Sequence, residues 1–136
     1  MVAGTDIQIE LERFFQSYAA AYNALDAAVV ARHIAAPSLL VEQATTVWST
    51  DADVLGAMER LVAFYRSKGF KSASFAVDRL VPQGADDAVV DVIWTIERQG
   101  AAPWHFRTGY NVHRADGQWR IVVCTAYEEL AVRQLA

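Results

Sequence analysis

The chain has 136 residues, and its 16 Asp and Glu outnumber its 12 Lys and Arg, which gives a formal net charge of −4. The basic residues are scattered, so nucleic-acid binding is not expected, and no apolar stretch is long enough to span a bilayer. The length favours a single domain over residues 1–136, and the lack of a signal-peptide pattern favours the cytoplasm. The hydrophobic fraction of 54% is high for a soluble chain, which indicates apolar area beyond a simple core, in a pocket or a subunit interface.

Two helices are predicted in the first 36 residues. An apolar stripe at helical spacing defines the first helix, and it consists of Ile7, Leu11, Phe14, Phe15, Tyr18, Tyr22 and Leu25. Thr5 and Gln8 predict a capping box at its start. Asp26 is suited to cap a second, shorter helix. That helix should end near Ala36, because Pro37 cannot continue it.

A short strand and a third helix are expected next. Residues 38–46 are apolar and β-prone, which indicates a strand. Thr50 and Asp53 are a helix-start signal. An amphipathic stripe follows up to Tyr65, and Gly69 predicts the C-terminal cap of this helix.

After Gly69 the hydrophobic period changes to two. Residues 72–83, 88–99, 104–114 and 119–129 predict four long strands separated by short turns. Short connections make neighbouring strands antiparallel. Helices segregated from an antiparallel sheet give an α+β fold.

Alternation predicts which face of the sheet is buried. The inward set is expected to be Trp104, Phe106, Thr108, Tyr110 and Val112 in one strand, and Trp119, Ile121, Val123, Thr125 and Tyr127 in the next. The opposite face of the last strand would then carry Val122, Cys124 and Ala126. A second apolar face is usually covered, so we predict a homodimer through the outer sheet face. Cys124, the single cysteine, is expected to be an inert buried thiol.

The chain resembles a known family. The segments that carry the resemblance are LERFFQSYAAAYNALD, VVARHIAAPSLLV and HRADGQWRIVV. They are similar to the nuclear transport factor 2-like superfamily, in its SnoaL-like branch. The resemblance implies a cone-shaped, curved antiparallel sheet with the N-terminal helices packed on its concave face. The superfamily includes ketosteroid isomerases, polyketide cyclases, dehydratases, epoxide hydrolases and non-catalytic binding subunits, and fold alone does not choose among them.

The catalytic patterns of these relatives are matched poorly. The base position of ketosteroid isomerases falls on Gln43, which cannot take a proton, and alternation should point Glu42 the other way. The Asp-Arg-Asp trio of epoxide hydrolases could draw on Asp91 and Arg107, with Asp78 and Arg79 one strand further. A solvated cross-strand ion pair is the simpler interpretation.

The histidines give no stronger signal. His33 lies on the apolar side of the second predicted helix, where a free imidazole could act as acid or base. A half-buried histidine bonded to a backbone carbonyl is the simpler interpretation. His105 and His113 fall on the predicted outer face. The spacing holds no metal signature, so no metal is expected, and no cofactor is implied.

Aromatic and polar-tipped side chains predict a small-molecule pocket. The expected ligand-binding residues are Tyr18, Tyr22, Trp48, Trp94, Trp104, Phe106, Tyr110 and Thr125. The favoured hypothesis is a protein that binds a small apolar or aromatic metabolite internally. One alternative is an enzyme of the cyclase, dehydratase, isomerase or epoxide hydrolase kind that uses His33, Asp91 or Tyr22. The other is a structural dimerisation module with a fully packed interior.

Overall fold

The computed structural model describes residues 3–128, with side chains from residue 6 onward. The elements follow the chain as α1 (Ala3–Asn23), α2 (Ala27–Ala31), β1 (Ile34–Val41), β2 (Thr45–Trp48), α3 (Asp51–Ser67), β3 (Phe70–Pro82), β4 (Asp87–Arg98), β5 (Trp104–Ala115) and β6 (Gln118–Thr125). The prediction that Thr5 caps the first helix is wrong, because α1 already begins at Ala3 and Thr5 lies inside it. The predicted final strand is shorter than expected and ends at Thr125, and its last predicted residue, 129, lies outside the described residues.

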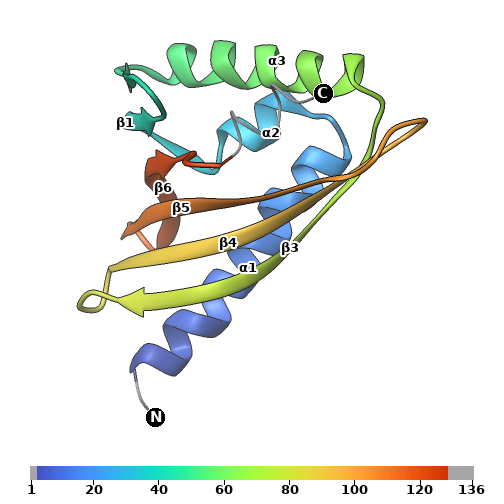
Figure 1. Cartoon of the computed structure of the whole chain (residues 1–136). Coiled ribbons are helices and arrows are strands. Elements are labelled where there is room, and N and C mark those ends of the chain that lie inside the picture. The colour runs from blue at the N-terminus through green and yellow to red at the C-terminus, as the bar shows by residue number, and fades with distance from the viewer. Residues whose placement is uncertain (1–2, 129–136) are drawn as a thin grey trace.

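The strands form one curved, unclosed sheet in the order β2-β1-β6-β5-β4-β3. The predicted meander from β3 to β6 is confirmed, and the neighbouring strands within it are antiparallel. Figure 1 shows α1 lying across the long strands, with α3 beside β1 and α2. The α+β fold with helices on the sheet is therefore as expected. None of the helices in the described part is both long and apolar enough to cross a membrane.

The second helix is shorter than predicted. It ends at Ala31, and β1 begins at Ile34, so Ala36 belongs to a strand rather than to a helix. The reason is a long-range contact, because the backbone N–H of Ile121 donates to the carbonyl of His33 at 2.8 Å. Pairing with β6 thus sets the end of the helical segment, before Pro37 can act.

The predicted strand over residues 38–46 is a hairpin of two strands. Leu40 of β1 pairs with Thr46 of β2, and the N–H of Glu42 donates to the carbonyl of Ala44 at 3.1 Å in the turn. On its other side β1 pairs with β6 in parallel. This pairing joins residues 84 to 87 positions apart in the sequence, and short-range patterns carry no signal for it.

The predicted inner face of β6 is wrong beyond Ile121. Val112 pairs with Ile121, yet Tyr110 pairs with Cys124, so β6 contains a bulge between them. A bulge adds one residue and reverses the alternation that follows. Cys124 therefore faces inward and Thr125 outward. Of the three apolar residues predicted on the outer face of β6, the half-buried Val122 lies there, whereas Cys124 and Ala126 lie on the inner face. The homodimer through the outer face stays a prediction.

A polar cluster fixes α1 against the sheet. Glu10 of α1 accepts hydrogen bonds from Arg114 at 2.9 Å and from Trp119 Nε1 at 3.0 Å. Arg114 also donates to Asp86 at 3.0 Å. The Trp119 hydrogen bond is the largest cause that lowers the pKa of Glu10. These contacts set the position of α1, and with it the tyrosines further along the helix.

His33 joins α1, α2 and β1. Its Nδ1 lies 2.8 Å from the carbonyl of Val29, and its Nε2 lies 2.9 Å from Ser17 Oγ. A carbonyl only accepts, so Nδ1 carries the proton, and Nε2 accepts from the Ser17 hydroxyl when the ring is neutral. Burial lowers the pKa of His33, partly offset by its backbone hydrogen bonds. The expected bond to a backbone carbonyl is present.

Gly69 ends α3 in a tight passage into β3. Its φ is +80°, and a Cβ there would lie 2.8 Å from the backbone oxygen of Gln99. Gly84 has a similar φ of +71° but open space around it. The predicted C-terminal cap is thus confirmed, and two constraints act on Gly69 while one acts on Gly84.

Gly69→Ala should destabilise the protein more than Gly84→Ala. The left-handed backbone costs each alanine variant about 1 to 2 kcal/mol. The clash with Gln99 should add about 1 kcal/mol or more at Gly69 alone. Urea unfolding of both variants measures the difference, and equal losses would show that the backbone at Gly69 shifts freely.

The free energy of unfolding should fall on acidification through the protonation of His33. Because the pKa of His33 in the folded protein lies below its ordinary value of 6.5, the unfolded chain binds more protons between the two pKa values. The stability contribution is complete above pH 6.5 and is lost as the pH falls through the folded pKa. Urea titrations of wild type and His33→Gln at pH 5 to 8 test this. The variant should show a flatter profile, and parallel profiles would contradict the assignment.

Candidate functional site

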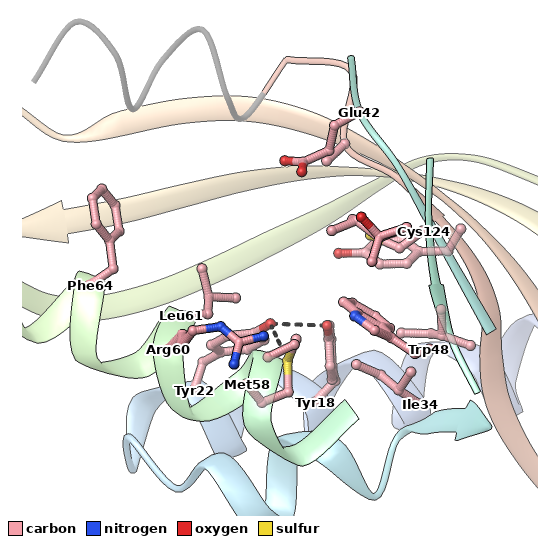
Figure 2. A pocket seen from close by; sticks show the side chains of 16 residues that line it. Tyr18, Tyr22, Ile34, Glu42, Trp48, Met58, Arg60, Leu61, Phe64 and Cys124 are labelled. Atoms are coloured by element: carbon pink, nitrogen blue, oxygen red, sulfur yellow. Dashed lines mark hydrogen bonds between the residues drawn. The ribbon is translucent and has the colours of Figure 1, made fainter. Parts of the chain in front are cut away.

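A cavity of about 360 Å³ lies between α1, α3 and the corner of the sheet formed by β1, β2 and β6. This volume falls within the range of small-molecule sites. The lining residues are Tyr18, Tyr22, Ile34, Leu40, Glu42, Thr46, Trp48, Ala57, Met58, Arg60, Leu61, Phe64, Tyr110, Ile121, Cys124 and Ala126. Figure 2 shows their side chains converging on a common space.

The inner part of the cavity is mostly apolar. Ile34, Trp48 and Ile121 close it on the sheet side, and Met58 and Leu61 close it on the α3 side. Trp48, Ile34 and Ile121 are buried, at 6%, 5% and 1% exposure, so they present fixed rather than mobile surfaces. Such a wall gains free energy by removing apolar ligand surface from water.

Two phenol groups meet at the α1 wall. Tyr18 and Tyr22 lie one helical turn apart, and their hydroxyl oxygens are 3.0 Å from each other. The hydroxyl of Tyr22 also points at the sulfur of Met58, at 3.9 Å. Burial raises the pKa of Tyr18 well above its usual value, and the nearby Tyr22 adds to this. Tyr18 therefore stays protonated at neutral pH and can serve as a hydrogen-bond donor.

Tyr110 contributes a third phenol from β5. Its hydroxyl accepts a hydrogen bond from Trp94 Nε1 at 2.9 Å. Tyr22 and Tyr110 also border a small second void of about 20 Å³, whose wall includes Trp94 and Phe106. That void is about the size needed for one water molecule. Trp94 and Phe106 thus border the second void and not the main cavity, and Trp94 fixes the hydroxyl of Tyr110.

Glu42 is the acidic residue of the lining, and its predicted direction is wrong. Leu40 faces inward opposite Cys124, and alternation then turns Glu42 to the same side. Gln43, the residue at the expected base position, is exposed in the hairpin turn. The cavity therefore has a carboxylate close to the place where the family resemblance puts one, shifted by a single residue.

Arg60 is the only cation among the described residues that line the cavity. It comes from α3, on the side opposite Glu42 in Figure 2. Its Nη1 lies 3.4 Å from the position that a Cβ on Gly56 would take, so the side chain folds back along the helix. Sequence reasoning missed Arg60 because it lies beside the apolar stripe of α3.

The remaining predicted ligand residues lie outside this cavity. Trp104 stacks on Phe64 with ring centroids 6.0 Å apart and borders neither void. Thr125 faces outward, opposite Gly109, because of the bulge in β6. Cys124, predicted as an outer-face residue, takes its place in the lining.

The predicted catalytic candidates do not lie together in one site. Tyr22 lines the cavity, whereas His33 does not. Asp91 lies on the outer face, where it pairs with Arg79 at 3.3 Å and accepts from the Tyr127 hydroxyl at 3.3 Å. Arg107 lies 3.8 Å from Asp78 instead. These are cross-strand ion pairs open to water, as the simpler interpretation expected.

The outer-face histidines also make local contacts. His105 Nδ1 lies 3.2 Å from Thr95 Oγ1, and His113 Nδ1 lies 2.7 Å from Asp87 Oδ1. Both side chains are exposed, on the predicted side of the sheet. Within residues 3–128, no group of three His, Cys, Asp or Glu side chains gathers as metal ligands.

The solved structures that this chain is similar to share its fold. An NTF-2 like protein of unknown function from Shewanella oneidensis MR-1 has a TM-score of 0.74 at 14% identity, covering 88% of this chain and 98% of its own. A ketosteroid isomerase-like protein from Erwinia carotovora atroseptica has a TM-score of 0.67 at 14% identity, covering 88% and 93%. A protein from Novosphingobium aromaticivorans, provisionally named a scytalone dehydratase, has a TM-score of 0.69 at 12% identity, covering 90% and 84%.

At these identities the likeness shows the fold alone. No curated protein matches the sequence. The model of the family described as NTF2-like protein (DUF6841) matches residues 9–129, which is most of the chain. The matched span contains α1 from residue 9 onward, every element from α2 to β6, and all the residues that line the cavity. The chain therefore belongs to this NTF2-like family.

Proposed function

We propose that this protein binds a small, mostly apolar molecule in the cavity between α1, α3 and the β1–β6 corner. The observation that carries the proposal is a cavity of about 360 Å³ with a buried apolar wall and a pair of hydrogen-bonded phenols. A fully packed structural module would leave no such space. Two structural neighbours have names that refer to enzymes of small molecules, which agrees with this use of the fold.

The phenols favour a ligand with an oxygen acceptor. The Tyr22 hydroxyl points at the thioether sulfur of Met58, which is a weak acceptor. A carbonyl or hydroxyl oxygen of a ligand is a stronger one. Ligand binding at this wall would replace a weak hydrogen bond by a better one inside a largely apolar space, where such bonds gain strength.

Filling the cavity should abolish uptake of an apolar dye. Ala57→Phe places a ring in the lining, and Ala63→Phe places the same ring on the exposed side of α3. With phenylnaphthylamine as the fluorescent probe, affinity should fall about tenfold or more in the first variant, since the apolar area available for burial is lost. The second variant should match the wild type.

Thermal unfolding of both variants checks that they fold. Absence of dye uptake by the wild type, or equal uptake by both variants, would contradict the proposed binding function.

A second candidate is an enzyme that moves a proton. The specific observation in its favour is Glu42, a carboxylate in the lining on the side opposite the α3 wall. A carboxylate can take a proton from carbon beside a carbonyl group, and phenols can hydrogen-bond to the oxygen that becomes negative. Tyr18 and Tyr22 supply such phenols in the same cavity.

Glu42→Gln should suppress proton exchange if this candidate holds. Tetralone, an apolar aromatic ketone, is incubated in deuterated buffer, and NMR follows deuterium uptake beside its carbonyl. Removal of a general base should slow the enzyme-dependent rate about 100-fold or more. Glu59→Gln, on the exposed side of α3, serves as the control. No acceleration by the wild type, or an unchanged rate in Glu42→Gln, would leave binding as the function.

A further inference from the structure

The cation in the cavity wall carries an inference about the chemical class of the ligand. Within the described residues, Arg79, Arg107 and Arg114 each form an ion pair with an acidic side chain. Arg60 has no ion pair or hydrogen bond in that same part of the chain. A guanidinium presents a planar set of donors that fits a carboxylate.

The position of Arg60 is set by its own helix. A side chain in a helix leans toward the N-terminus, over the preceding turn. That turn carries Gly56, and the guanidinium lies where a larger side chain would crowd it, 3.4 Å from a Cβ placed there. Arg60 thus lies along the α3 edge of the cavity, next to the apolar Ala57 and Leu61.

Glu42 makes the two sides of the cavity differ in charge. In Figure 2 its carboxylate lies on the strand side, and the guanidinium of Arg60 lies on the α3 side. A negatively charged group on a ligand is attracted to the α3 side and repelled from the strand side. The apolar part of the ligand then fills the space beside Trp48, Ile34 and Ile121.

We propose that the ligand is an apolar organic acid, whose carboxylate binds to Arg60 while its hydrophobic body occupies the inner cavity. The inference rests on the proposed binding function and adds the charge of the ligand to it. It concerns a preference between ligands of equal shape, so it can fail while the binding function stands.

Two ligands of nearly the same shape, one anionic and one neutral, test whether the cavity prefers a negative charge. Naphthalene carboxylate and naphthalene carboxamide have nearly the same shape and differ by one charge at neutral pH. Their affinities are measured by calorimetry and by displacement of phenylnaphthylamine. The wild type should bind the carboxylate about tenfold more tightly than the amide, as a charge-assisted hydrogen bond predicts. The preference should shrink as salt concentration rises, because the cation is exposed.

Substitutions test whether Arg60 causes the preference for the carboxylate ligand. Arg60→Gln should remove the preference, so that the carboxylate and the amide bind with equal affinity, and Arg60→Lys should keep part of it. Arg66→Gln, an exposed arginine of the same helix outside the lining, is the control and should keep all of it.

Three outcomes would overturn the inference. They are equal affinities for the two ligands in the wild type, a preference that survives in Arg60→Gln, and tighter binding of the cation naphthylmethylamine, which would make Glu42 the recognition group. If the wild type takes up neither the dye nor either ligand, the binding function fails as well.

Discussion

The parallel pairing of β1 with β6 is the constraint on which the cavity depends. It sets Ile34 opposite Ile121 and Leu40 opposite Cys124, and both strands depart from regular register to do so. Side chains alternate along a strand, so a slip of one residue would turn this whole set to the other face. With the observed register, Leu40 and Glu42 face the cavity, and the bulge in β6 brings Cys124 in beside them.

The second requirement is that α1 is held against the sheet in one position. Glu10 and Arg114 form a partly buried ion pair at one end of this helix, and the aromatic stripe packs along the rest. Buried hydroxyl groups cost free energy unless they find partners. Tyr18 and Tyr22 satisfy each other at 3.0 Å, and burial keeps Tyr18 protonated. Each phenol has one proton, so Tyr18 donates to Tyr22 while Tyr22 donates to the sulfur of Met58, and both hydroxyl groups are oriented before a ligand arrives.

Local patterns predicted the parts of the fold that depend on local interactions. The meander follows from period-two alternation and short turns, and the inner face of β5, from Trp104 to Val112, is as predicted. The bulge in β6 could not be predicted from the sequence, because Val122, Val123 and Cys124 are all apolar and fit either face of the sheet. The direction of Glu42 depends on the register of β1 against β6. Tyr18 and Tyr22 were found because they belong to a long, regular stripe, whereas Arg60 lies outside one.

The two charges of the cavity wall bear both on the proposed binding function and on the alternative proposal of proton transfer. An acid held by Arg60 would point its body toward the strands, where Glu42 lies on the opposite side. Binding and proton transfer then make different demands on the same ligand. Binding needs an apolar body and one anionic end. Proton transfer needs, in addition, an acidic C–H group within reach of Glu42 and an oxygen beside Tyr18 and Tyr22. A molecule with the first set of features alone would be held without reaction, so the chemistry of the ligand decides between the two functions as much as the protein does.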